Sequence, residues 1–470
     1  MIPMTLAEVA AVTGGRLDPP GQATGAVRVD GPVVTDSREA GPGGLYVARI
    51  GEHADGHDFV AGAGAAGAVA ALVTRPVSDL PCVVVDDTQE AFAALAREVV
   101  RRAPGLAVVG ITGSSGKTST KDLLGAVLAT AGETVAPMGS YNSEVGVPLT
   151  VCRVGPSTRF LVVEMGARGA GHIEYLTRMA PPNVGVVLNV GTAHVGEFGS
   201  RAAIARAKSE LVAALDPSGL AVLNADDPAV RAMSDDTAAR VVLVGESEDA
   251  DVRASAVELD DHGRASFTLH APAGERPVRL GLVGRHHVGN ALAVVAAALE
   301  LGLDEASVVA ALEAATPVSR WRMEVTERPD GVTVVNDAYN ANPDSMRAAL
   351  TALQRMGRGR RTWAVLGTML ELGDESEALH AEVGEEAVAR GVDELLVVGE
   401  AARPLASGAV SAAAVHGATT RIRTATDADA AEVLLRAELR PGDVALFKSS
   451  RDAGLRLLGD RLAAPPEERT

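Results

Sequence analysis

The sequence contains few cysteines and no excess of basic residues. Its two cysteines, Cys82 and Cys152, lie in apolar contexts without Cys-x-x-Cys spacing. We therefore expect neither a disulfide framework nor a zinc site, as suits a reducing cytoplasm. The formal net charge of −18 leaves no basic surplus to neutralise phosphates, which argues against nucleic acid as a partner.

Long apolar runs are also missing. Stretches such as residues 291–299 are too short to cross a bilayer. The N-terminus lacks the basic head and apolar run of a signal peptide. We therefore expect a globular cytoplasmic chain that does not insert into membranes.

The composition is that of a folded protein with several domains. Hydrophobic residues make up 47% of the sequence and charged residues 22%, which excludes disorder. A length of 470 residues predicts about three domains. Segments at residues 101–105 and 315–318 resemble linkers, so we place domains at 1–103, 104–315 and 316–470. We expect the domains to close by hinge motion at residues 101–106 and 314–318.

Strand and helix patterns indicate an α/β fold in all three domains. A capping box of Thr5 and Glu8 predicts a short first helix, and Thr88 is the expected N-cap of a longer one. Apolar strands alternate with helices after residue 106, which indicates a parallel sheet covered on both faces. Alternating residues at 252–283 predict an antiparallel appendage, and the last domain returns to a Rossmann-like α/β pattern.

One stretch organises the chain. An apolar strand at residues 106–109 leads into a loop of glycines and hydroxyls at 113–116, and a helix begins at Lys117. Backbone N–H groups and a helix N-terminus at such a loop bind phosphate, with Lys117 on the β/γ-phosphates and the Thr118 hydroxyl on Mg²⁺. The common pattern has a glycine where this chain has Ile111. The alternative is a glycine-rich turn whose lysine is merely solvated.

Polar residues end two of the predicted central strands. Glu164 follows an apolar strand directly, and His194 follows the next one closely. Both are candidates to join Thr118 around Mg²⁺. The alternative is a buried glutamate paired with a basic residue and a histidine in the core. Lys208 lies on a short helix, where a lysine is most often on a solvated face.

Basic residues near strand ends in the outer domains leave two readings open. Lys448 and Arg451 either face phosphates across an interdomain cleft or pair with Asp452 or Asp443. Arg38 either binds a phosphate or pairs with a nearby aspartate.

Taken together, the motifs resemble the Mur ligase family, in the right order over all three domains. They lie at residues 112–119, 142–148, 193–200, 207–210, 284–290, 336–343 and 448–451. The likeness is greatest to the members that add a dipeptide, and it implies an ATP-dependent ligase. The expected reaction joins D-alanyl-D-alanine to UDP-N-acetylmuramoyl-tripeptide through an acyl phosphate, giving the pentapeptide precursor of peptidoglycan. The alternatives are the family member that adds the third residue and an ATP-binding scaffold without catalysis.

The resemblance also implies site residues. The implied ATP loop consists of Gly113, Ser114, Ser115, Gly116, Lys117, Thr118 and Ser119. The implied magnesium set, for two ions, consists of Thr118, Glu164, His194 and Lys208, with a carbamate on Lys208. The implied catalytic residues are Lys117, Lys208, His194 and Glu164.

Further positions carry over to the nucleotide and to the substrates. Asn290 matches the adenine side, Arg322 a nucleotide contact and Asp337 the ribose. The implied substrate positions are Asp36, Ser37 and Arg38 for the UDP-sugar, with Asn142, Tyr339, Asn340, Lys448 and Arg451 toward the domain cleft. We expect the protein to be a monomer whose partners are UDP-N-acetylmuramoyl-tripeptide and D-alanyl-D-alanine.

The chain departs from the family pattern at three of these motifs. It has Ser-Tyr-Asn-Ser at 140–143, His-His at 286–287 and Lys-Ser-Ser-Arg at 448–451. The family often has Asn-x-Asn-Asn, His-Asn and Lys-Gly-Ser-Arg there. Because Asn142, Asn290 and Arg451 remain, these departures bear on single site residues more than on the family.

Overall fold

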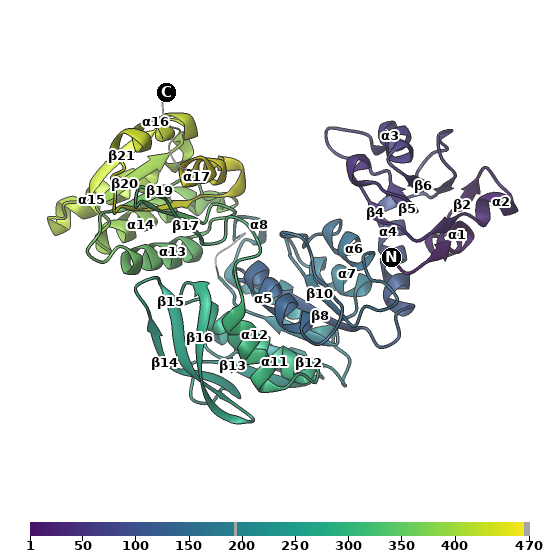
Figure 1. Ribbon diagram of the computed structural model, residues 1–470, viewed down its shortest axis with the longest axis horizontal. Coiled ribbons are helices and arrows are strands. Elements are labelled where there is room, and N and C mark those ends of the chain that lie inside the picture. Colours follow the sequence, from purple (N-terminus) through teal and green to yellow (C-terminus); the bar gives the residue numbers. More distant parts are fainter. Residues whose placement is uncertain (192–194, 465–470) are drawn as a thin grey trace.

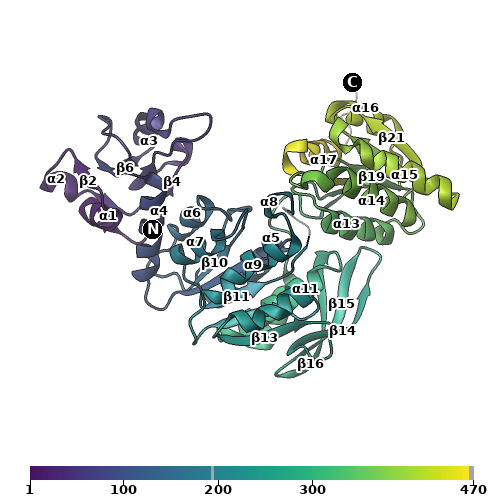
Figure 2. The ribbon, with the colours of Figure 1, turned by 180° about the vertical axis from the view of Figure 1, so that it is seen from behind.

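A computed structural model describes residues 1–191 and 195–464 (Figure 1). The N-terminal part (purple) and the C-terminal part (yellow-green) lie at opposite ends, and the central part lies between them. Figure 2 shows the same arrangement from behind. Among the described helices, none has the length and apolar character needed to span a membrane. The fold is α/β in all three parts, as predicted.

The N-terminal part is a five-stranded sheet in the order β2-β7-β6-β5-β4, with a separate β1-β3 ladder. The predicted capping box at the first helix is present, since Thr5 N donates to Glu8 Oε2 at 2.7 Å. The elements are β1 (Met4–Thr5), α1 (Leu6–Thr13), β2 (Arg16–Asp18), α2 (Gln22–Gly25), β3 (Arg28–Val29), β4 (Val33–Val34), β5 (Gly44–Val47), α3 (Val60–Ala65), β6 (Ala68–Val73), β7 (Cys82–Val84) and α4 (Thr88–Arg101).

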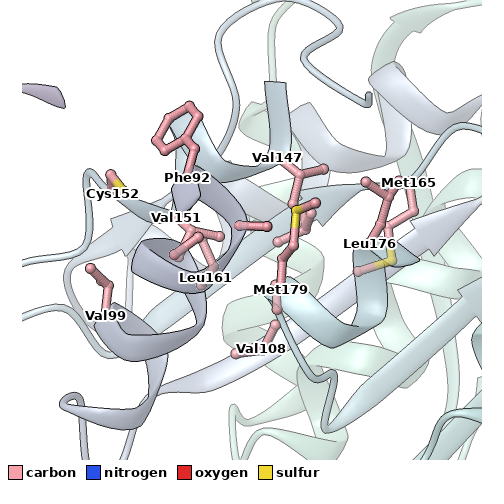
Figure 3. Close-up of a cluster of buried hydrophobic side chains, with 14 of the residues drawn as sticks. Phe92, Val99, Val108, Val147, Val151, Cys152, Leu161, Met165, Leu176 and Met179 are labelled. Carbon is pink, nitrogen blue, oxygen red and sulfur yellow. The ribbon is translucent and has the colours of Figure 1, made fainter. Parts of the chain in front are cut away.

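Helix α4 joins the N-terminal part to the central part through a shared core (Figure 3). Phe92 and Val99 of α4 are fully buried in the same cluster as Val151 and Leu161 of the central part. The predicted N-cap of this helix is wrong by one residue. The Asp87 carboxylate caps it by accepting hydrogen bonds from the first free N–H groups, those of residues 89 and 90.

The central part is a nine-stranded sheet in the order β16-β15-β14-β13-β12-β11-β8-β10-β9. Strands β8 to β13 pair in parallel, and β14, β15 and β16 form the predicted antiparallel appendage. The strands are β8 (Ala107–Thr112), β9 (Thr134–Val135), β10 (Phe160–Glu164), β11 (Val184–Val187), β12 (Leu220–Asn224), β13 (Arg240–Gly245), β14 (Val252–Leu259), β15 (Arg264–Ala271) and β16 (Gly274–Val283).

Helices cover both faces of the central sheet. One core packs α5 and α11 against it, and the other packs α7 and α9 against the opposite face. Parallel strands buried on both faces explain the near-continuous apolar runs in the sequence. The helices are α5 (Lys117–Ala129), α6 (Gly146–Val151), α7 (His172–Met179), α8 (Val195–Phe198), α9 (Arg201–Ala213), α10 (Pro228–Arg231), α11 (His287–Glu300) and α12 (Glu305–Ala314).

The C-terminal part is a six-stranded sheet in the order β17-β18-β22-β19-β20-β21. Sequence patterns missed its two edge strands, β17 and β21, because they are partly exposed and rich in charged residues. The elements are β17 (Glu324–Glu327), β18 (Thr333–Asn336), α13 (Pro343–Met356), β19 (Thr362–Leu366), α14 (Ser376–Ala389), β20 (Glu394–Val398), α15 (Arg403–His416), β21 (Arg421–Ala425), α16 (Ala428–Glu438), β22 (Val444–Lys448) and α17 (Leu455–Ala463).

The shared core around α4 generates a first prediction. Phe92→Ala removes a fully buried ring, so we expect it to lower the free energy of unfolding by about 3–5 kcal/mol in urea titrations. Phe59→Ala is the matched control, since this ring is 47% exposed, and its loss should cost about 1 kcal/mol or less. Equal losses in the two variants would contradict a common core.

Candidate functional site

The loop between β8 and α5 is held in place by the end of the neighbouring strand. Ser114 N donates to Asn189 O at 3.0 Å, and Ser115 N donates to Asn189 Oδ1 at 2.9 Å. Gly116 has φ +81°, and a Cβ built there would lie 2.8 Å from Asn290 Oδ1. Both the backbone conformation and the close approach therefore require glycine at this position.

Lys117 folds back over this loop. Its Nζ donates to Gly113 O at 2.6 Å. No carboxylate of the described residues forms an ion pair with it, and burial lowers its pKa below the ordinary value. The alternative of a merely solvated lysine is wrong, because the ammonium is desolvated beside the glycine loop. The unpaired cation fits an anionic ligand.

Glu164 is the central acidic group of the site. Its carboxylate, only 1% exposed, accepts from Thr118 Oγ1 at 2.9 Å, from Ser140 Oγ at 2.9 Å and from Asn142 Nδ2 at 2.8 Å. No lysine, arginine or histidine of the described residues pairs with it, so the alternative of a buried salt bridge is wrong. The arrangement leaves a buried negative charge on the wall of a cavity.

The donors around Glu164 fit a hard divalent cation. Within residues 1–191 and 195–464, no group of three or more histidine, cysteine or acidic side chains forms a metal cage. Mg²⁺ does not need one, since it takes one or two protein oxygens and completes its shell with water and phosphate. Thr118 Oγ1 and the Glu164 carboxylate offer such oxygens. His194, predicted as a further ligand, lies outside the described residues.

Lys208 lies on the inner face of α9, not on a solvated face as a lone helical lysine would. It is 5% exposed and forms no ion pair with a described residue. Burial, with a smaller contribution from nearby Lys117, lowers its pKa well below the ordinary lysine value. This burial therefore favours an unprotonated amine, which is a nucleophile.

Arg322 reaches the phosphate loop from the segment that precedes β17. One of its terminal nitrogens donates to Thr118 Oγ1 at 3.0 Å, and its guanidinium lies 4.4 Å from the Tyr339 ring centroid. The flanking residues Trp321 and Met323 have φ of +60° and +50°, a strained backbone in non-glycine residues. This strained backbone brings the Arg322 guanidinium to the phosphate loop.

Lys448 is paired, but with neither of the predicted partners. Its Nζ lies 2.6 Å from Asp337 Oδ2 and donates to Asn340 O at 3.1 Å. Asp443 instead pairs with Arg361 at 2.6 Å. Lys448 and Asp337 therefore form a buried ion pair on the wall of the cavity.

A cavity of about 520 Å³ collects most of the predicted site residues. The predicted residues that line it are Ser114, Ser115, Gly116, Lys117, Thr118, Ser119, Asn142, Glu164, Lys208, Asn290, Arg322, Asp337, Tyr339, Asn340, Lys448 and Arg451. Asp36, Ser37 and Arg38 do not line it. In the N-terminal part, Arg38 Nε donates to Asp36 Oδ1 at 2.9 Å, so the pairing reading describes their present arrangement.

Sequence reasoning missed several residues that line or support the cavity. Ser140 lies in the motif where the chain departs from the family pattern, and Asn189 follows the end of β11. Asn189 was marked as a polar residue directly after a predicted strand, whereas Ser140 follows no predicted strand. His287 Nδ1 and Asn290 Nδ2 are buried without a hydrogen-bond partner, which leaves two polar atoms to be satisfied by a ligand.

A backbone contact between two glycines joins the central part to the C-terminal part. A Cβ built on Gly196 would lie 2.5 Å from Gly373 N, and one built on Gly373 would lie 2.8 Å from Gly196 Cα. Gly196 N donates to Glu371 O at 3.4 Å. Since no side chain fits between the two glycines, a larger residue must displace one part from the other.

Family models match all three parts of the chain. The Mur ligase family, catalytic domain, matches residues 32–103, the Mur ligase middle domain matches 111–298, and the Mur ligase, glutamate ligase domain, matches 321–451. The UDP-N-acetylmuramoyl-tripeptide–D-alanyl-D-alanine ligase of Mycobacterium tuberculosis is 50% identical over 99% of this chain and 98% of its own length.

Solved structures extend the likeness to the whole fold. A UDP-N-acetylmuramoylalanyl-D-glutamyl-2,6-diaminopimelate–D-alanyl-D-alanyl ligase from Acinetobacter baumannii has a TM-score of 0.84 at 31% identity, covering 98% of both chains. The MurF ligase of Thermotoga maritima, solved in complex with ADP, has a TM-score of 0.79 at 30% identity, covering 93% of this chain and 98% of that one.

The glycine contact generates the second prediction. Gly373 and Gly391 have φ of +60° and +70°, but a Cβ on Gly391 meets nothing within 4 Å. Alanine at either position costs about 1–2 kcal/mol of left-handed strain, and only Gly373→Ala adds a clash between the two parts. We expect only Gly373→Ala to raise the radius of gyration in small-angle scattering. The same radius in both variants would contradict the contact.

Proposed function

The chain belongs to the Mur ligase family, and we propose that it joins D-alanyl-D-alanine to UDP-N-acetylmuramoyl-tripeptide at the expense of ATP. The products are UDP-N-acetylmuramoyl-pentapeptide, ADP and phosphate. The observation that carries the proposal is the 50% sequence identity to a ligase named for this reaction, over nearly the whole length of both chains. The cavity supports it, because it places an unpaired lysine and a buried carboxylate beside a phosphate loop.

The three parts divide the binding work. We propose that residues 1–103 hold the UDP-sugar, that 104–315 hold ATP and that 316–470 complete the site for ligation. The family models, which end or begin near these boundaries, support this division. Asp36, Ser37 and Arg38 then hold the substrate by its nucleotide end, away from the reacting carboxylate.

ATP and Mg²⁺ are the cofactors of this reaction. The glycine loop with Lys117 fits the phosphates, and the unpaired Asn290 Nδ2 and His287 Nδ1 fit a base. Thr118 and Glu164 are the residues that would hold Mg²⁺, which neutralises charge on the phosphates during transfer. Arg322, which donates to Thr118, would contact the nucleotide beside the loop. Asp337, which accepts from Met323 N, would contact its ribose.

In the first step, the terminal carboxylate of the tripeptide attacks the γ-phosphorus of ATP. The new bond joins a carboxylate oxygen to phosphorus, and the bond from that phosphorus to the bridging oxygen of ADP breaks. Both reactants are anions, so Lys117 stabilises charge that develops on the transferring group. The Asn142 and Ser140 donors keep the Glu164 carboxylate facing this group.

In the second step, the free amine of D-alanyl-D-alanine attacks the acyl carbon. A carbon–nitrogen bond forms, the carbon–oxygen bond to phosphate breaks, and phosphate leaves with the proton that the amine nitrogen loses. Water must be excluded, because it would hydrolyse the acyl phosphate. We propose that Tyr339, Asn340 and Arg451, on the C-terminal side of the cavity, position the dipeptide there.

Lys208 supports a carbamate. An unprotonated amine adds to carbon dioxide, forming a carbon–nitrogen bond and releasing a proton, and the product is an anion able to help hold a second metal ion. Burial and the neighbouring Lys117 favour that unprotonated amine. We also propose that the protein acts in the cytoplasm and as a monomer.

Phosphate release tests the proposed function. Purified protein with ATP and Mg²⁺ should release phosphate only when both UDP-N-acetylmuramoyl-tripeptide and D-alanyl-D-alanine are present, and mass spectrometry should detect the pentapeptide. ATP binding without phosphate release under these conditions would identify a scaffold and contradict the ligase.

Lys117 generates the third prediction. Lys117→Ala removes the cation that faces the transferring phosphoryl group, so we expect kcat to fall by about 100-fold or more. Steady-state phosphate release measures it, with circular dichroism to check folding. Lys121→Ala is not a suitable control because Lys121 is buried, whereas Arg206→Ala changes an exposed cation and should leave kcat within about twofold.

Lys208 generates the fourth prediction. Lys208→Ala should lose most activity, and added short carboxylates such as formate or acetate should partly restore it by supplying the missing anion. Since only the neutral amine adds carbon dioxide, the wild type should lose its carbamate as the pH falls through the lowered pKa of Lys208. Carbon-13 NMR with labelled bicarbonate measures the carbamate directly. Full activity of Lys208→Ala would remove this role.

A further inference from the structure

Two charged side chains of opposite sign line the cavity without a role in phosphoryl transfer. They are Glu144, in the loop before α6, and Arg168, in the loop between β10 and α7. Neither forms an ion pair with any described residue, and both are exposed. A solvated pair of opposite charges that does not pair internally fits a ligand carrying both charges.

The two loops lie side by side because they are bonded to each other. Gly166 N donates to Asn142 O at 2.8 Å, and Glu144 and Arg168 each lie two residues beyond this bond. The loops are also anchored at their outer ends. Gln89 Nε2 of α4 donates to Glu144 O at 2.6 Å, and Gly171 N donates to a carboxylate oxygen of Glu210 on α9 at 2.6 Å. Both side chains therefore stand on a fixed backbone.

The position of these loops identifies the part of the substrate that they face, an argument that rests on the proposed function. The reacting carboxylate of the tripeptide must lie near Lys117 and Glu164, and its UDP end in the N-terminal part. The loop with Glu144 spans this path, since Asn142 contacts Glu164 and the Glu144 backbone contacts α4. The third residue of the peptide carries the reacting carboxylate, so its side chain emerges beside this loop.

We propose that Glu144 and Arg168 form a subsite for a third residue whose side chain itself ends in an amino acid group, as in diaminopimelate. The Arg168 guanidinium binds the distal carboxylate in a bidentate manner, and the Glu144 carboxylate accepts from the distal ammonium. A lysine side chain carries only the ammonium. It leaves Arg168 without a partner and brings a like charge toward it.

Two tripeptide substrates, one with diaminopimelate and one with lysine as the third residue, test the subsite. We expect the wild type to prefer the diaminopimelate substrate by about tenfold in kcat/KM, the size of one charge-assisted contact. Arg168→Gln should raise KM for that substrate by about tenfold at similar kcat, and should leave the lysine substrate within about twofold. Glu144→Gln should raise KM for both, because both carry the distal ammonium.

Arg178→Gln is the matched control, since Arg178 lies on α7 but pairs with Glu174 and does not line the cavity; its substrate ratio should equal that of the wild type. A misfolded variant would lose activity on both substrates equally, so the ratio reports the subsite alone. Turnover with an unchanged ratio in Arg168→Gln would overturn the subsite and leave the ligase standing. A raised KM for D-alanyl-D-alanine instead would assign Arg168 to the dipeptide and overturn it too. No pentapeptide from either substrate would remove the proposed function itself.

Discussion

The Glu164 carboxylate is the group on which the site depends. It lies at the last position of β10 and is buried, so it must be satisfied by donors from elsewhere in the chain. Thr118 supplies one from the first turn of α5, while Ser140 and Asn142 supply two from the loop before α6. Three segments are thus fixed around one negative charge. Because the donors are neutral, the charge itself remains to be balanced by a ligand.

Two lysines of the site likewise lack a partner of opposite charge among the described residues. Lys117 and Lys208 are both desolvated, and the charge of Lys117 further lowers the tendency of Lys208 to hold a proton. Neither is neutralised by a described carboxylate, so a polyphosphate bound at the loop gains more from Lys117 than it would from a paired lysine. Lys448 differs, since Asp337 already compensates it. Its contribution to anion binding is weaker, and its part is to fix the wall on the C-terminal side.

Much of this site could be predicted from the local sequence, and the rest could not. The strand, glycine loop and helix around Lys117 are contiguous, so their pattern specifies them, and Glu164 is marked as a carboxylate at the end of an apolar strand. Ser140 carries no such mark, because its role arises only when the loop before α6 folds onto β10. The Asp337 partner of Lys448 lies more than a hundred residues away, and parallel pairing of β18 with β22 brings the two together. Arg322 depends on a strained backbone that no local preference predicts.

The two predicted hinges differ in the free energy that motion at each would cost. Motion at residues 101–106 would separate α4 from the central part, exposing Phe92 and Val99, which are fully buried. Exposing such side chains costs about 1.5–3 kcal/mol each, so the N-terminal part is held by its core. The C-terminal part meets the central part through a glycine contact, the bond from Arg322 to Thr118, polar groups around a cavity and a small apolar contact of Val283 with the C-terminal core. The polar contacts exchange readily with water or ligand, and the apolar contact is much smaller than the core around α4. We therefore predict that closure over a bound nucleotide moves the C-terminal part about residues 314–318, while the N-terminal part stays packed on the central part.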